Sequence, residues 1–399
     1  MMPPILLIQE PQRPALRPAG FALWQLGFRP FYLLASGFAA VSIGLWALQF
    51  SGWLPLAYLA GPLWHAHEML FGFTLAVMVG FLLTAGRNWS NRPTLTGLPL
   101  AALALLWVAG RVLVLTPFGW AAALVNAAFP LAAAAALALP FWAARNRRNY
   151  FFVGVLVLMS AAEAGVHLSQ LGVLNLPPWL GVQVGLDMAL FIITVMAGRV
   201  IPMFTNNGVP GAGAAQYAWL DNAALASVLA LLAADLLRLD GVALAAIALF
   251  GAAAHALRWV LWKPWKTLST PLVWVLHAAY AWIPVHLALR AAFELGVVSG
   301  STATHALTVG AVGGLVIGMM TRTSRGHTAR PMRADGFDTA CYALVLLAAL
   351  VRVVLPLAAP ASLRQAVVGS AALWSAGFGL FAIRYWPVLT RPRLDGKPG

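Results

Sequence analysis

The chain has 399 residues, of which 61% are hydrophobic and only 9% charged, with a mean hydropathy of +0.83. This composition excludes a soluble domain, which could not hide so much apolar surface. The net charge of +14 is dispersed along the chain, which argues against a nucleic-acid-binding protein. A single cysteine, Cys341, excludes an intrachain disulfide and a cysteine-bound zinc or iron–sulfur site. Any metal must therefore be held by histidine, methionine or carboxylate.

The N-terminal residues, MMPPILLIQEPQRP, lack the leading basic residues of a secretory signal, and we expect a Pro-rich cytoplasmic tail over residues 1–27. Residues 28–386 then form one all-α membrane domain, followed by a basic cytoplasmic tail over 387–399. Apolar windows of about 20 residues, separated by short polar or Pro/Gly breaks, predict about twelve transmembrane helices. The predicted spans are 28–50, 65–86, 94–115, 119–142, 149–172, 179–205, 216–236, 240–262, 271–297, 302–322, 336–357 and 361–385. No repeat that would divide the chain into two halves is visible.

The distribution of basic residues tests the number of spans. With twelve spans and both termini in the cytoplasm, most of the 25 Lys and Arg residues fall inside. A miscounted span would scramble this asymmetry, because cytoplasmic loops retain positive charge during insertion. Only five of these basic residues lie on the outer side of the membrane or towards that side, namely Arg111, Arg238, Arg290, Arg352 and Arg364.

The span that begins near residue 65 is the most informative. Read as an α-helix, it aligns His65 and Glu68 with the small residues Gly72, Ala76 and Gly80. Small-residue stripes allow membrane helices to approach closely. We therefore expect this helix inside the bundle, with its polar side chains facing inward.

Ionisable side chains at membrane depth are costly and mark candidate functional sites. Glu163 and His167 are four residues apart on one helical face, so Glu163 either orients the imidazole or shares a metal with it. A layer drawn from four predicted spans lies near the outer face: His65, His67, Glu68, Glu163, His167, Asp187 and His305. Interhelical hydrogen bonding alone does not explain such a group, and we predict a metal site there.

The remaining histidines lie deeper or towards the inside. His277 and His286 share one predicted span but are nine residues apart, which places them on opposite faces. Pro284 between them predicts a kink. His327 lies at the inner end of a later span. For His255, a packing role is favoured.

Imidazole-rich sites without thiolates suit haem iron, copper or zinc, and two histidines from different membrane helices commonly hold haem. This pattern predicts redox chemistry or the binding of a small diatomic gas. Arginines near a haem edge commonly pair with its propionates. We therefore consider three arginines as candidate partners of the haem propionates: Arg87, Arg199 and Arg290.

The segments HAHEMLFGF at residues 65–73 and GFLLTAGRNWS at 80–90 resemble the signature of the NnrS family of bacterial inner-membrane proteins. Similar matches are GRVIPMFT at 198–205, the histidine-containing span around 274–282 and the segment 305–331. The resemblance implies a twelve-span, multi-pass protein that contains haem b and copper. It also implies a role in the nitric oxide response, in resistance to nitrosative stress and in denitrification. Nitric oxide or another small diatomic ligand, the lipid bilayer and a membrane electron donor are the expected partners.

The chain departs from the family pattern at two places. Residues 162–167 read AEAGVH, which brings Glu163 near His167, and residues 326–331 read GHTARP. We expect His65 and His67 to contribute to copper binding, and the haem ligands to come from His167, His286 and His305. Further candidates for metal or cofactor binding are His277, Glu163, His327, Arg87, Arg199 and Arg290.

Two alternatives remain open at this stage. A haem–copper redox enzyme acting on nitric oxide predicts a buried adjacent histidine pair and a proton-conducting chain of acids from one face. A twelve-helix secondary transporter predicts interrupted helices repeated in corresponding halves. Against the first alternative, the sequence has no adjacent histidines. Against the second, its second half contains no counterpart of the His-rich helix.

Overall fold

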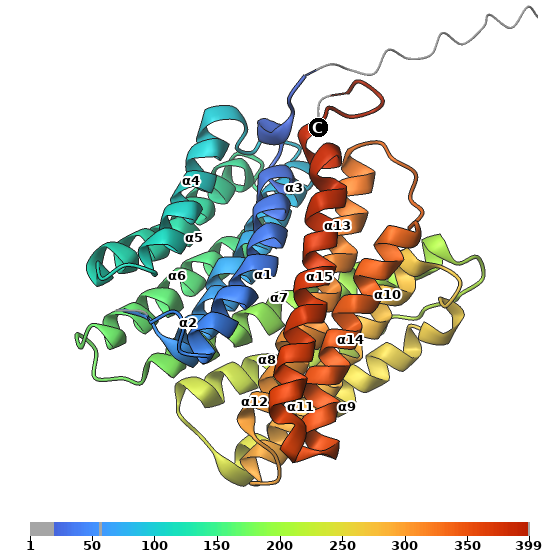
Figure 1. The fold of residues 1–399 in the computed structure, drawn as a ribbon. Helices are drawn as coiled ribbons and strands as arrows, with labels where there is room; N and C mark the ends of the chain where they lie inside the picture. The colour runs from blue at the N-terminus through green and yellow to red at the C-terminus, as the bar shows by residue number, and fades with distance from the viewer. Residues whose placement is uncertain (1–19, 56–57, 398–399) are drawn as a thin grey trace, which may run out of the picture.

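The computed structural model describes residues 20–55 and 58–397, which are helical between short connections and contain no strand in that part (Figure 1). This confirms the predicted all-α bundle. The helices are α1 Phe28–Phe50, α2 Gly61–His67, α3 Leu75–Ser90, α4 Gly97–Leu113, α5 Gly119–Ala143, α6 Tyr150–Gln170, α7 Pro178–Gly208, α8 Ala218–Leu236, α9 Gly241–Leu261, α10 Pro271–Tyr280, α11 Trp282–Glu294, α12 Gly300–His305, α13 Gly314–His327, α14 Gly336–Ala358 and α15 Leu363–Thr390.

Within the described residues, 11 helical segments are long and apolar enough to cross a membrane. The remaining predicted span is the shorter apolar helix Gly97–Leu113. The last segment continues to Thr390, so the predicted C-terminal tail at 387–399 begins inside α15. Of the predicted N-terminal tail, residues 1–19 lie outside the described residues. The span predicted to kink at Pro284 is interrupted at Ala281, between α10 and α11.

Two spans share an interruption that the sequence analysis did not anticipate. A π-helix, Glu68–Thr74, separates α2 from α3, and a second, Ala306–Gly313, separates α12 from α13. Each π-helix directly follows a histidine, His67 or His305. From the sequence we expected no counterpart of the His-rich helix in the second half of the chain. That expectation is wrong for these two spans, because both have a histidine followed by a π-helix. Wide helical turns of this kind are rare and occur frequently at functional sites.

Both ends of the described chain lie at the same end of the bundle. The Ala22 amide donates to the Thr390 carbonyl at 2.8 Å, and Nη1 of Arg29 donates to the Leu389 carbonyl at 2.9 Å. In Figure 1, α1 and α15 run side by side up to this end, and Nε1 of Trp374 donates to a carbonyl of α1 at 3.2 Å. From the charge distribution we predict that this end faces the cytoplasm.

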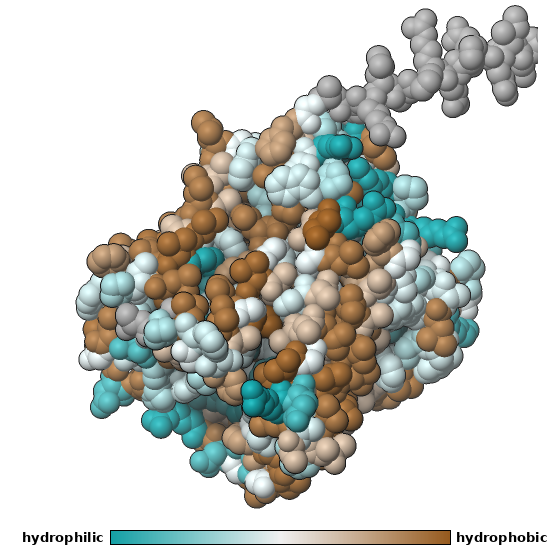
Figure 2. All heavy atoms as spheres, in the orientation of Figure 1, coloured by the Kyte–Doolittle hydropathy of each residue, from teal (hydrophilic) through white to brown (hydrophobic). Residues whose placement is uncertain are grey.

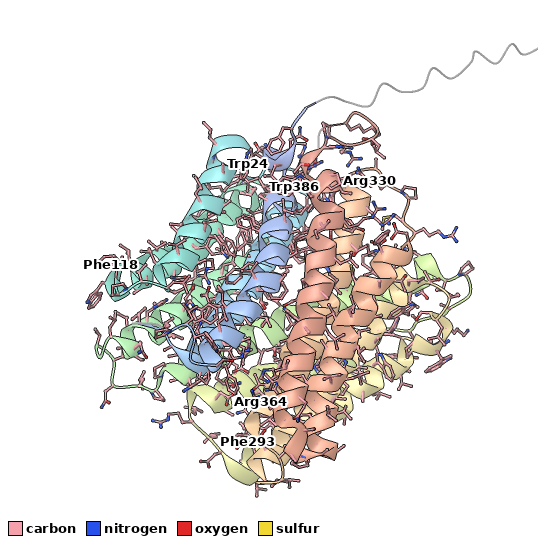
Figure 3. All side chains as sticks on the ribbon, viewed as in Figure 1. Trp24, Phe118, Phe293, Arg330, Arg364 and Trp386 are labelled. Atoms are coloured by element: carbon pink, nitrogen blue, oxygen red, sulfur yellow. The ribbon has the colours of Figure 1, made fainter. Side chains whose placement is uncertain are left out.

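The outer surface matches a lipid environment. Figure 2 shows hydrophobic residues over the middle of the face formed by α1 and α15, with hydrophilic residues mostly towards the ends. Trp24, Trp386 and Arg330 lie at the end that carries the chain termini, whereas Arg364 and Phe293 lie at the opposite end (Figure 3). Arginine thus lies near both ends and tryptophan near the end with the termini, and tryptophan is enriched at membrane interfaces.

Candidate metal centre

The helix α2 lies at the end of the bundle opposite the chain termini and carries two histidines with different partners. His65 and His67 are two residues apart, which turns their side chains by about 200° around the helix. His67 is fully buried against His167 of α6. The ring of His65 instead faces His305 of α12. The structure therefore places these histidines in two clusters.

Three buried side chains converge around His67. Its Nε2 atom lies 3.1 Å from Nε2 of His167 and 3.5 Å from Oε1 of Glu163. One ligand atom from each residue lies within 4.8 Å of the others. None of the three is more than 1% exposed. The helical face that Glu163 and His167 share on α6 thus points at α2, and the two helices form one His₂Glu cluster.

A second hydrogen bond holds the far nitrogen of each imidazole. Nδ1 of His67 donates to Oε1 of Glu68 at 2.7 Å, because a carboxylate can only accept. Nδ1 of His167 lies 2.8 Å from the Tyr58 hydroxyl. Burial raises the pKa of Tyr58 to about 12, so this phenol keeps its proton at neutral pH. The proton on Nδ1 of His67 leaves its Nε2 lone pair free, as in most metal-binding histidines.

Arg111 of α4 connects the two carboxylates. Its Nη1 donates to Oε1 of Glu68 at 2.6 Å, and its Nη2 lies 3.8 Å from Oε1 of Glu163. The guanidinium also donates to Oδ1 of Asn126. A Cβ atom at Gly72 would lie 2.6 Å from Nη1, so glycine in the first π-helix makes room for this arginine.

The cluster carries unbalanced charge. With neutral imidazoles, the two carboxylates, Glu68 and Glu163, and the single guanidinium of Arg111 leave one negative charge in excess. A buried charge without compensation is costly, so the cluster needs either a proton or a bound cation. Oε2 of each carboxylate is also buried, with no hydrogen-bond partner among the described residues.

Geometry and donor atoms both suit a metal ion. Two nitrogens about 2.0 Å from one ion lie about 3.3 Å apart in a tetrahedral site. The two Nε2 atoms of His67 and His167 are 3.1 Å apart. Imidazole and carboxylate without thiolate suit copper or zinc. His67, His167 and Glu163 supply three ligands, which leaves one tetrahedral position open.

A second histidine pair lies on the other side of α2. The ring centroids of His65 and His305 are 6.2 Å apart, and the ring planes differ by 10°. Nδ1 of His305 donates to the Ser301 carbonyl at 2.6 Å, and the ring of His65 stacks on Trp46 with centroids 5.0 Å apart. Two imidazoles on opposite sides of one metal ion, with bonds of about 2.0 Å, have centroids about 6 Å apart. The spacing of this pair therefore suits a bis-histidine site.

The other predicted histidines have separate partners. Nδ1 of His286 donates to the Ala303 carbonyl at 2.8 Å, close to the helix that carries His305. Nε2 of His277 lies 2.8 Å from the Thr205 hydroxyl. These hydrogen bonds account for one nitrogen of each ring, and neither histidine joins a metal-ligand cluster among the described residues.

The predicted haem arginines are spread over the bundle. Arg290 is paired with Asp235 at 2.6 Å and with Glu294 at 2.9 Å, so carboxylates already balance its charge. Arg199 lines a cavity at the end of the bundle that carries the chain termini, together with His327. Arg87 lies in the last turn of α3. The described residues show no contact between these three arginines and the four clustered histidines.

Three residues of the site were not predicted. Tyr58 lies in a connection and carries no sequence signal. Arg111 is a cation within an apolar run, and the cost of ionisable groups at membrane depth could have identified it. Asn126 looks like an ordinary polar residue of a helix. The roles of Arg111 and Asn126 follow only from the contacts that α4 and α5 make with the cluster. That of Tyr58 follows from its contact with His167.

Gly181 of α7 allows close packing beside the metal ligands. A Cβ atom there would lie 2.5 Å from the Ala162 carbonyl and 2.8 Å from a methyl carbon of Val166, which flank Glu163 on α6. We expect Gly181→Ala to push the two helices apart and cost about 1–3 kcal/mol of stability, because backbone cannot yield cheaply. Thermal unfolding with metal analysis checks this. Gly154→Ala, with open space around its Cβ, is the control.

Comparison with known proteins adds a family match. The family model described as NnrS protein matches residues 22–393, which is nearly the whole chain. No curated protein matches the chain. The matched region contains both histidine clusters and every helix from α1 to α15.

Proposed function

Since the chain belongs to the NnrS family, we propose that this multi-pass membrane protein binds copper and haem b, serves the nitric oxide response and protects against nitrosative stress. We place it in the bacterial inner membrane. The observation that carries the proposal is the buried cluster of His67, His167 and Glu163. Its donor set fits a transition metal, and a bound cation would balance its excess negative charge.

We assign copper to this cluster. Two imidazoles whose Nε2 atoms face each other and one carboxylate suit copper, and a monovalent copper ion would neutralise the excess negative charge. The assignment differs from the sequence-based expectation, which grouped His65 with His67. On α2 these two side chains point away from each other, so they cannot share one ion without unwinding the helix.

We assign haem b to the second pair, His65 and His305. Arg352 lies beside it, with Nη2 donating to the Ser301 hydroxyl at 3.0 Å, and makes no ion pair within the described residues. Its charge is therefore available to a propionate. A cavity of about 670 Å³ between α1 and α15 reaches Trp46, which stacks on His65. Arg352 supports a counter-charge for a propionate, and the cavity adjoins the pair only through Trp46, since neither His65 nor His305 lines it.

When bound, copper would supply the coordination chemistry that captures a diatomic ligand, and a haem held by two histidines would supply electron transfer. The chain's own residues prepare that step. Glu68 and Tyr58 hold the imidazoles, and Arg111 anchors both carboxylates. Burial excludes water from the open position, which strengthens every electrostatic interaction there. Nitric oxide is small and uncharged, so it can reach such a site through the lipid.

The deciding experiment separates the two clusters. Purified protein is examined by absorption spectroscopy, oxidised and reduced, with iron and copper counted on the same sample. We expect haem b bands and about one copper per chain. His65→Ala and His305→Ala should each abolish the reduced haem bands and retain copper, because the ligand set of the other cluster is intact. Haem retained in both variants would refute the bis-histidine assignment.

Tyr58→Phe provides a milder test of the copper cluster. It removes only the hydroxyl that contacts Nδ1 of His167. Losing such an outer hydrogen bond typically weakens metal binding by about 10–100-fold. Competition with a copper chelator measures the change. Tyr217→Phe, at an exposed position at the start of α8, is the matched control and should have no effect.

A redox enzyme acting on nitric oxide is a second candidate. The sequence lacks adjacent histidines, but the fold brings His67 and His167 within 3.1 Å and surrounds them with buried carboxylates. Turnover predicts continuous consumption of nitric oxide in the presence of an electron donor. A stoichiometric burst followed by no further consumption would instead support binding alone.

A further inference from the structure

A cavity of about 970 Å³ lies at the end of the bundle that carries the chain termini. It is bounded by the last turns of α3 and α13, by α7 and by the short turn Arg147–Asn149. His65 and His305 lie at the opposite ends of the same membrane segments, Gly61–Ser90 and Gly300–His327. Its walls are largely apolar and rich in methionine: Phe81, Trp89, Met196, Met203, Phe204, Met319 and Met332.

Within the described ranges 20–55 and 58–397, four arginines line this cavity, namely Arg148, Arg199, Arg322 and Arg393, and no carboxylate does. Arg393 is paired with Asp395 at 2.8 Å, but the other three form no ion pair in the described part of the chain. The Arg199 guanidinium lies 3.3 Å from Oδ1 of Asn149. That of Arg322 lies 3.6 Å from the centroid of the Phe204 ring. Arg199 and Arg322 belong to spanning helices and are half-buried, so their charge is poorly solvated and lacks a counter-charge.

The combination of charge and apolar wall restricts the ligand. A small inorganic anion would satisfy the arginines but leave the methionine and aromatic walls uncovered. Methionine side chains adapt to irregular flexible chains, and arginine binds phosphate with two parallel hydrogen bonds. Basic pockets between membrane helices on the cytoplasmic side are characteristic sites for acidic lipid headgroups.

We propose that this cavity binds an anionic phospholipid, with its phosphate between Arg199 and Arg322 and its first acyl carbons along Met196 and Met319. The site is independent of the metal clusters. It rests on an arginine group without counter-charge, in a cavity whose remaining lining is mostly apolar. The predicted cytoplasmic position of this end places the cavity where the acidic headgroups of the inner leaflet lie.

The test compares lipid binding by native mass spectrometry in a neutral detergent, with phosphatidylglycerol and phosphatidylcholine of identical acyl chains. Phosphatidylglycerol should bind more tightly. Arg199→Gln with Arg322→Gln should weaken its binding by about 30-fold and leave phosphatidylcholine unchanged. Arg199→Lys with Arg322→Lys keeps the charge and should retain most of the binding. Arg92→Gln with Arg145→Gln removes two exposed charges at the same end and is the matched control.

Four results would overturn the proposal. One such result is equal binding of the two lipids. Another is equal weakening of phosphatidylglycerol binding by the cavity and control variants, which would reduce the effect to general attraction between the lipid and the basic surface. Binding of inorganic phosphate that depends on Arg199 and Arg322, without such dependence for lipid, would assign the arginines to a soluble phosphate compound. Loss of haem from the cavity variant and from His327→Ala would assign them to propionates.

Discussion

Replacing His167 by alanine is expected to empty the copper site and to leave the haem spectrum unchanged. The substitution removes one of three ligands, and His67 and Glu163 alone cannot compete with chelating buffers for the ion. Copper measured on the purified protein should fall from about one per chain to less than about a tenth of that. The effect should exceed that of Tyr58→Phe, which perturbs the same imidazole only through a hydrogen bond.

The control for this prediction is another buried histidine. His255 contacts the Tyr280 hydroxyl through Nδ1 at 2.7 Å and belongs to neither cluster. His255→Ala removes the same side chain from the bundle interior and should retain copper. If His167→Ala and the unsubstituted protein hold equal copper, the His₂Glu assignment fails. If both alanine variants lose copper equally, the loss reports destabilisation of the bundle.

Arg111→Met is expected to produce the largest loss of stability. The side chain is only 8% exposed and, among the residues that the structure describes, is the one cation that contacts both Glu68 and Glu163. Its removal leaves two buried carboxylates without a counter-charge, which typically costs about 3–5 kcal/mol. The melting temperature in detergent should fall by about 4–6 °C. The copper content should fall as well, because Glu68 also orients His67.

Two further variants isolate the electrostatic cause. Adding Glu68→Gln to Arg111→Met removes one of the uncompensated charges and should recover part of the stability, which a double-mutant cycle measures. Arg238→Met removes an exposed arginine at the end of α8 and should change little. A melting temperature unaffected by Arg111→Met would show that the carboxylates are neutral without the arginine.

The sequence by itself determined the membrane architecture. Lipid offers no hydrogen bonds to the backbone, so each spanning segment must be a long apolar helix. Such helices can be recognised in the sequence as apolar runs. The predicted span 28–50 coincides with α1, and most other boundaries differ by only a few residues. The depth of each ionisable residue followed from its position in its span. This is why the sequence placed His67, Glu163, His167 and His305 in one layer.

Only the tertiary structure decided which of these residues meet. Their grouping depends on the rotation of each helix about its axis and on its neighbours, and hydropathy carries no such information. His65 and His67 separate because α2 presents them to different helices, and the π-helix after His67 changes the register beyond that point. Arg111 and Tyr58 complete the site through contacts between segments distant in sequence. The copper and haem assignments therefore rest on packing. The hydrophobic effect determines the depth of a side chain in the membrane, but only close contact between specific helices determines its partners.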